Sequence, residues 1–148
     1  MAKSRGVADL RTLLIACGNT LRCDDGVAHL VLRGIAPAPG CETRFVQQLM
    51  PELAQELTGF GRVVFLDADA RCMNLVIEPL PALVSRSPLT HAADAGEIVA
   101  LARALFGFTG EAFVCRIPAR DFSPGGSLSP VARRAIDEAL GELRRLPA

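Results

Sequence analysis

Val63-Val64-Phe65-Leu66-Asp67 is the most informative stretch of this 148-residue chain. Its four apolar residues are β-branched or bulky and form a run too short for a helix, so we predict a strand. A strand that is apolar throughout is covered on both faces, and this places it at the centre of a parallel sheet. We expect the strand to end at Asp67.

Strand and helix signals alternate on both sides of this stretch. Further strands are predicted at 13–17, 43–46, 74–78 and 112–117, and helices at 27–35, 51–58, 95–106 and 130–145. Pro79 and Pro81 make 74–78 an edge strand, Asp94 and Glu97 form a capping box, and Ser129 caps the last helix. The alternation predicts a three-layer α/β/α fold with a twisted, mostly parallel five-stranded sheet.

Composition limits the kind of protein this can be. Sixteen Lys and Arg balance sixteen Asp and Glu, which argues against a nucleic-acid partner. No apolar run is long enough to cross a membrane and no signal-peptide pattern opens the chain, so we expect a cytoplasmic protein. Five scattered cysteines fit reduced thiols rather than disulfides. We expect a flexible lead-in at 1–11 and a single domain at 12–148.

Acidic residues stand directly after two of the predicted strands. Asp24 and Asp25 end the loop that follows the first strand, and Asp67 ends the central strand. Ligands of such sheets bind beyond the carboxyl ends of the strands. The loop lacks a GxGxxG pattern, and a phosphate would meet like charge there, so a nucleotide-binding domain is the weaker alternative. Paired carboxylates favour a cation.

His91 lies in a loop predicted to return to the same sheet edge. With Asp25 and Asp67 it would form an O/O/N site with open positions, which suits nickel, zinc or manganese. Each residue also has a simpler interpretation: Asp25 as a helix cap, Asp67 as a turn residue, His91 as a surface histidine. His29 follows Asp25 by four residues and could pair with it, but we expect His29 to be solvent-exposed.

Several segments resemble, in order, the hydrogenase maturation protease family. Gly18-Asn19-Thr20-Leu21-Arg22-Cys23-Asp24-Asp25-Gly26 resembles its G-N-x-L-x-x-D-[DE]-G motif. The others are 48–53 (Q-L-x-P-E-L), 65–68 with the strand-ending aspartate, 89–91 with 97–99 (the histidine loop and the helix after it), and 117–118 with 128–130 (I-P…L-[ST]-P). The resemblance spans residues 12 to about 143.

The resemblance implies a metal-dependent endopeptidase. Its metal-binding and catalytic residues would be Asp25, Asp67 and His91, and Gly18, Asn19 and Asp24 would help to bind the cofactor. The implied substrate and partner is the precursor of a nickel-iron hydrogenase large subunit, which loses a C-terminal extension after nickel insertion. Nickel would therefore arrive with the substrate, and another divalent ion could occupy the site at rest. A monomer is expected.

The sequence departs from the family pattern in ways that leave alternatives open. Asp25 stands where the family often has glutamate, so its carboxylate reaches less far. Cys23 replaces a frequent glycine and could contact nickel through its thiolate, as could Cys72, but we expect buried or incidental cysteines. A nickel-checkpoint or chaperone protein that does not cleave is the main functional alternative.

Overall fold

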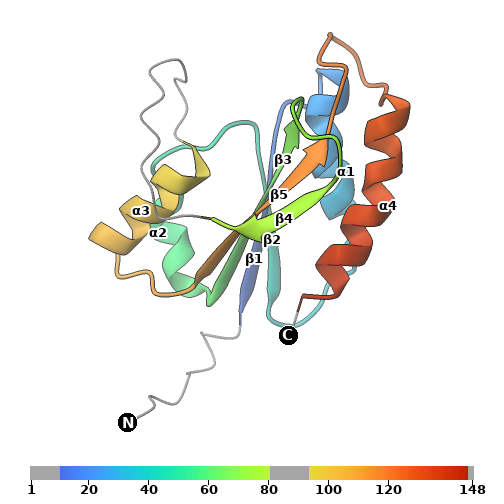
Figure 1. The fold of residues 1–148 in the computed structure, drawn as a ribbon. Helices are drawn as coiled ribbons and strands as arrows, with labels where there is room; N and C mark the ends of the chain where they lie inside the picture. Colours follow the sequence, from blue (N-terminus) through green and yellow to red (C-terminus); the bar gives the residue numbers. More distant parts are fainter. Residues whose placement is uncertain (1–10, 81–93, 147–148) are drawn as a thin grey trace.

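The computed structural model describes residues 11–80 and 94–146, and a five-stranded sheet lies between two pairs of helices (Figure 1). The strands are β1 (Thr12–Cys17), β2 (Cys41–Val46), β3 (Arg62–Asp69), β4 (Val76–Pro79) and β5 (Glu111–Pro118). The helices are α1 (Val27–Arg33), α2 (Leu53–Glu56), α3 (Ala95–Leu105) and α4 (Pro130–Arg144), with 3-10 turns η2 (Cys23–Gly26) and η3 (Leu57–Gly59).

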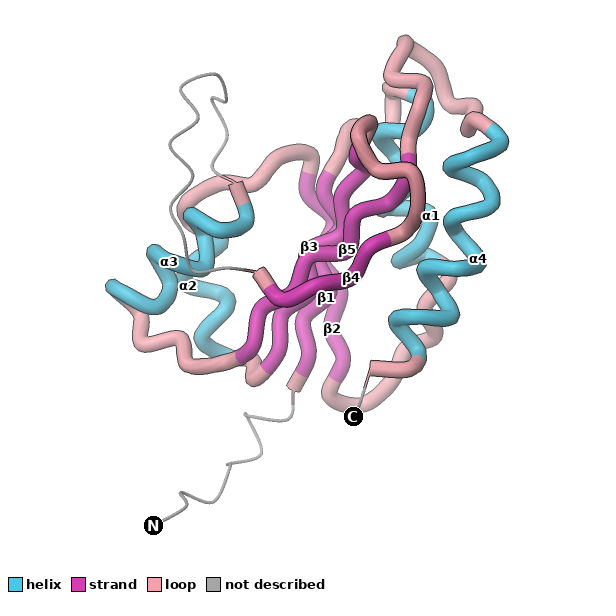
Figure 2. Tube along the Cα trace, in the orientation of Figure 1, coloured by secondary structure: helices cyan, strands magenta, loops and turns pink. Residues whose placement is uncertain are grey.

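The strand order is β2-β1-β3-β5-β4, so β3 is central as predicted and β4 is an edge strand (Figure 2). β2, β1, β3 and β5 run parallel, and β4 pairs antiparallel with β5. The predicted three-layer α/β/α fold with a mostly parallel five-stranded sheet is therefore confirmed.

Two apolar clusters hold the layers together. One cluster packs α2 and α3 onto the sheet face that carries Leu13, Ile15 and Phe65. The other packs α1 and α4 onto the opposite face, which carries Leu14, Val64 and Leu66. Val63 to Leu66 alternate between the two clusters and are all buried, because β3 is covered on both sides.

The predicted caps of the long helices are confirmed. The Asp94 side chain accepts a hydrogen bond from the Glu97 N–H at the start of α3. The Ser129 hydroxyl accepts one from the Ala132 N–H at the start of α4, where Pro130 occupies the first turn. These bonds satisfy helix N–H groups that have no partner within the helix.

Some boundaries differ from the prediction for physical reasons. β3 does not end at Asp67 but continues to Asp69, because β5 runs on beside it and pairs Asp69 with Pro118. The helix predicted from Pro51 is a single α-turn, α2, followed by η3. Within the described parts of the chain, no helix is long and apolar enough to cross a membrane. The expected lead-in falls almost entirely on residues 1–10, outside the described residues.

Candidate active site

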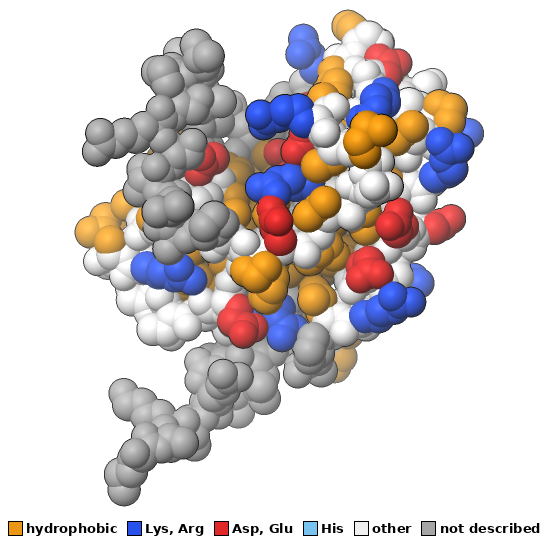
Figure 3. Space-filling view, viewed as in Figure 1, with side chains coloured by type: hydrophobic (Ala, Val, Ile, Leu, Met, Phe, Trp, Pro, Cys, Tyr) orange, Lys and Arg blue, Asp and Glu red, His pale blue; other side chains and the backbone are white. Residues whose placement is uncertain are grey.

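A cleft of about 920 Å³ opens at the carboxyl ends of β1 and β3, on the sheet face that α2 and α3 cover only in part. Its walls come from the loop after β2, the start of α3 and the side chains of β3 and β5. Figure 3 shows acidic and basic side chains close together in the middle of the face that β4 crosses. Asp25 and Asp67 both line the cleft, as predicted from their positions after strands.

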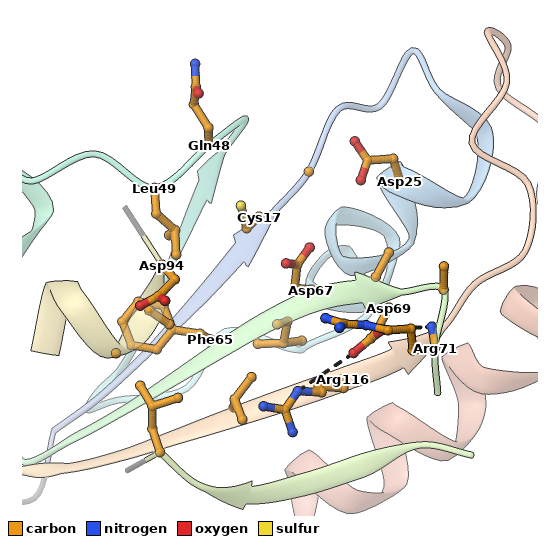
Figure 4. Close-up of a pocket in the computed structure, with 18 of the residues that line it drawn as sticks. Cys17, Asp25, Gln48, Leu49, Phe65, Asp67, Asp69, Arg71, Asp94 and Arg116 are labelled. Carbon is orange, nitrogen blue, oxygen red and sulfur yellow. Dashed lines mark hydrogen bonds and ion pairs between the residues drawn. The ribbon is translucent and has the colours of Figure 1, made fainter. Parts of the chain in front are cut away.

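Asp67 projects from β3 into the space that Asp25 and Cys17 also face (Figure 4). Desolvation by the surrounding protein and the negative charge of Asp25 raise the pKa of Asp67 to about 7. The Asp67 side chain is nevertheless exposed at the mouth of the cleft, so solvent moderates both effects. The interpretation of Asp67 as a turn residue is wrong, because its backbone belongs to the β3–β5 ladder opposite Arg116.

The loop after β1 fixes the position of Asp25. The Asn19 N–H donates to Asp25 Oδ2 at 2.8 Å, and Asn19 Oδ1 accepts from the Leu21 N–H at 2.9 Å. Gly18 has φ +145°, and a Cβ there would lie 1.9 Å from the Asp25 carbonyl oxygen. Gly18 and Asn19 thus position Asp25. The helix-cap interpretation of Asp25 is wrong, because Gly26 is the N-cap of α1 and no side chain caps it.

Asp24 is fully buried, and its contacts differ from those of its neighbour Asp25. Its Oδ1 accepts from the Ser129 N–H at 2.7 Å. Its Oδ2 accepts from the Arg120 N–H at 2.7 Å, the Asp121 N–H at 3.0 Å and the Ser129 hydroxyl at 2.6 Å. Burial acts to raise the pKa of Asp24, but these bonds outweigh it and hold the pKa below its ordinary value. Asp24 does not line the cleft.

The two histidines have different outcomes. His91, the predicted third ligand, lies outside the described residues. Among residues 11–80 and 94–146, no three His, Cys, Asp or Glu side chains are grouped closely enough to hold a metal ion. The prediction that His29 is solvent-exposed is wrong. His29 is 9% exposed, its Nε2 lies 3.1 Å from the Val46 carbonyl oxygen, and its ring packs against Phe45. The Val46 carbonyl gives the buried His29 ring a hydrogen-bond partner.

All five cysteines are free, and only Cys17 lines the cleft. Burial, together with the charges of Asp67 and Asp25, raises the pKa of the Cys17 thiol to about 12. Cys17 is therefore a neutral thiol at physiological pH and a poor nucleophile in the metal-free cleft. Cys23 is buried beside Ser123, and Cys72 has a raised pKa because of burial and the nearby Asp69 carboxylate. Neither lines the cleft.

A group of charged residues beside Asp67 had no counterpart in the sequence analysis. Arg116 of β5 forms an ion pair with Asp69, with Nε 3.8 Å from Oδ2, and another with Glu78 of β4. Arg71 also contacts Asp69, at 3.9 Å. Asp69, Arg71 and Arg116 line the cleft. The alternation of apolar and charged residues at the ends of two neighbouring strands was the available signal.

Comparison with known proteins gives matches in structure only. No protein-family model and no curated protein matches the sequence. A [NiFe] hydrogenase maturation protease, HycI, from Thermococcus kodakarensis matches with a TM-score of 0.71 at 16% identity, over 90% of this chain and 90% of that one. The hydrogenase maturating endopeptidase HybD from E. coli matches with a TM-score of 0.65 at 17% identity, over 90% and 89%.

A third match is the [NiFe] hydrogenase maturation protease HybD from Thermococcus kodakarensis, with a TM-score of 0.63 at 21% identity, over 93% of this chain and 99% of that one. These matches cover nearly the whole length of both partners, so the likeness is not confined to a common sheet motif. The chain has the fold of the hydrogenase maturation endopeptidases.

Proposed function

We propose that this chain is a metal-dependent endopeptidase that removes the C-terminal extension of a nickel-loaded [NiFe] hydrogenase large-subunit precursor. The observation that carries the proposal is the pair Asp25 and Asp67. Asp25 of η2 and Asp67 of β3 line one cleft, and the charge of Asp25 raises the pKa of Asp67. A fold shared with named hydrogenase maturation endopeptidases supports it.

The cleft suits a cationic part of a substrate. The pKa of Asp67 is raised because partial desolvation and the Asp25 carboxylate disfavour its negative charge. A bound cation would reduce both of these unfavourable effects. Carboxylate oxygens accept divalent ions, and nickel also favours an imidazole ligand. We therefore propose that Asp25, Asp67 and His91 bind the nickel that the precursor carries, and that the Asn19 N–H keeps Asp25 oriented.

Amide hydrolysis then needs a water molecule, which adds to the scissile carbonyl and leaves a new carboxylate and a new amine. Binding the nickel places the scissile peptide over the cleft, and the charge of the metal assists the reaction by polarising the water or the carbonyl. Cys17 is not proposed as a nucleophile, since its pKa of about 12 keeps it protonated. The general base is left unassigned.

The test is incubation of the purified chain with a nickel-loaded large-subunit precursor and with the same precursor lacking nickel. Mass spectrometry should detect the released C-terminal peptide only with nickel. Asp25→Asn, Asp67→Asn and His91→Ala should each abolish release, whereas Asp137→Asn on the exposed face of α4 should not. Unchanged cleavage by His91→Ala would remove that residue from the mechanism. Tight nickel-dependent binding without product would instead identify a checkpoint or chaperone protein.

A further inference from the structure

Arg116 and Asp67 are direct neighbours across two strands. They form one register pair of the parallel β3–β5 ladder, and both line the cleft. Paired residues in a parallel sheet lie about 5 Å apart at Cα and project to the same face. The long Arg116 side chain could therefore reach the Asp67 carboxylate, and a guanidinium beside a carboxylate normally forms a bidentate ion pair with it.

The Arg116 side chain instead pairs with two other acids, Asp69 and Glu78. Figure 4 shows the contact with Asp69. Its Nε lies 3.8 Å from Asp69 Oδ2, and its Nη1 donates to Glu78 Oε1 on the edge strand. Asp69 is itself held by the Arg71 N–H, which donates to Oδ1 at 2.8 Å. In the described part of the chain, no basic nitrogen lies within ion-pair distance of Asp67.

We infer that Asp69 and Glu78 are positioning residues that hold the Arg116 guanidinium away from Asp67 and so keep the Asp67 carboxylate available for a divalent cation. The inference rests on the proposed function, because it assigns a role to residues beside the same site. If the Arg116 guanidinium paired with Asp67, an incoming cation would have to displace it from the carboxylate. Two acidic partners, one on each side of Arg116, remove that competition.

The geometry explains why two acids are present. Asp69 lies two residues beyond Asp67 on β3, so it draws the guanidinium along the strand. Glu78 pairs in register with Val114, two residues before Arg116, so it draws the guanidinium toward the edge. Each alone leaves Arg116 part of its freedom, since its side chain is 36% exposed and solvent weakens single ion pairs. Loss of both leaves Asp67 as the nearest carboxylate on the sheet.

The direct test is a crystal structure of the Asp69→Asn/Glu78→Gln double variant without metal. Both substitutions keep size and shape while removing charge. The expected result is the Arg116 guanidinium within about 4 Å of the Asp67 carboxylate. A guanidinium that keeps its place, or that turns into solvent, would overturn the inference. If the double variant does not fold, the single variant Glu78→Gln provides the same readout, with partial occupancy of the new ion pair expected.

A double-mutant cycle in Ni²⁺ affinity, measured by calorimetry with the metal alone, separates this mechanism from a general change of charge. If the Arg116 charge acts only through long-range repulsion of the metal, Arg116→Gln should strengthen Ni²⁺ binding by the same factor in the wild-type chain and in Asp69→Asn/Glu78→Gln. If Arg116 moves to Asp67 in the double variant, the effects are coupled. Arg116→Gln should then change Ni²⁺ affinity little in the wild-type chain but strengthen it about tenfold in Asp69→Asn/Glu78→Gln. A tenfold change in affinity corresponds to about 1.4 kcal/mol.

The two proposals fail in different ways. If the wild-type chain shows no Ni²⁺ binding that depends on Asp67, the proposed function is contradicted. The position of Arg116 in the double variant would still decide the inference. Ni²⁺ binding that depends on Asp67, combined with equal effects of Arg116→Gln in both backgrounds, would overturn the inference and leave the proposed function standing.

Discussion

Asp67 bears a carboxylate whose ionisation opposes folding. Desolvation and the neighbouring Asp25 raise its pKa to about 7, so the folded chain binds a proton there at pH values where the unfolded chain does not. Stability due to this group is therefore lost as pH rises from about 4 to about 7. Asp67→Asn removes the ionisable group and should flatten the fall in unfolding free energy across this range.

At pH 8 the Asp67→Asn variant should be more stable than the wild-type chain by on the order of 1 kcal/mol, a value reduced for the water that reaches the cleft. Urea unfolding at pH 5 and pH 8 measures both effects. Asp25→Asn is the matched variant, because removing its charge should lower the pKa of Asp67 and weaken the pH dependence. An Asp67→Asn variant that is less stable than wild type at pH 8 would contradict this account.

Gly18 allows the chain to turn toward Asp25 at a point where no side chain fits. Its φ is +145°, and an added Cβ would approach the Asp25 carbonyl oxygen to 1.9 Å. Gly18→Ala should therefore cost about 3 kcal/mol or more in unfolding free energy, and it should weaken cation binding by displacing Asp25. Gly126→Ala, which meets nothing within 4 Å, should change stability by less than about 1 kcal/mol. Urea unfolding of the pair checks the difference.

Single residues in the site differ in how far the sequence could predict them. Asp25 and Asp67 could be placed at one cleft because both lie near the carboxyl ends of parallel strands, Asp25 beyond β1 and Asp67 within the last residues of β3. The role of Asp24 could not, since its partners Arg120, Asp121 and Ser129 lie about a hundred residues later. The burial of His29 depended on the Val46 carbonyl, which a helical spacing argument does not see.

Among the elements, η2 and the segment before α4 depend on each other through Asp24. The carboxylate accepts from three backbone N–H groups and the Ser129 hydroxyl, and this hydroxyl also caps α4. Asp24→Asn turns one acceptor into a donor that faces these donors. We expect a loss of about 2–4 kcal/mol in unfolding free energy. Asp137→Asn on exposed α4 should cost less than about 0.5 kcal/mol; equal losses in urea unfolding would contradict this role.

The same contacts give Asp24 an opposite pH dependence from Asp67. Hydrogen bonds from Ser129, Arg120 and Asp121 outweigh burial and lower the pKa of Asp24. Its stabilisation is present above the unfolded pKa near 4 and is lost as pH falls through the lower folded value. Acid unfolding of Asp24→Asn should therefore show less pH dependence below about pH 4 than the wild-type chain.

Element types could be predicted because hydrophobic period and capping residues are local. Exact lengths depended on neighbours. β3 gains Ala68 and Asp69 because β5 continues to Pro118 beside them, and this extension places Asp69 near Arg116. The helix expected from Pro51 shortens to one turn, in which the Leu53 N–H bonds the Met50 carbonyl three residues earlier. The charged group beside Asp67 exists only once the strands are paired.

At the scale of the whole molecule, the two faces of the sheet differ in polarity. Near the carboxyl ends of β3 and β5, the face toward α1 and α4 is apolar and carries Leu66, Cys115 and Ile117. The face toward α2 and α3 changes there from apolar to charged. The covered part of the sheet forms the apolar cores, and the open part forms the cleft in which we propose that a cation binds. This arrangement lets Asp67 be held at a cost to stability that the cores offset.

Binding of a divalent cation should therefore stabilise the whole chain in a pH-dependent way. A cation that binds only the folded state adds about 2.7 kcal/mol at a hundred times its dissociation constant. Asp67 must release a proton to bind it, so the rise in Tm with excess Ni²⁺ should be large at pH 8 and small at pH 5.5, below its pKa of about 7. EDTA should reverse the rise, and Asp67→Asn should lack it. Equal shifts at both pH values, or a shift retained in Asp67→Asn, would place the cation elsewhere.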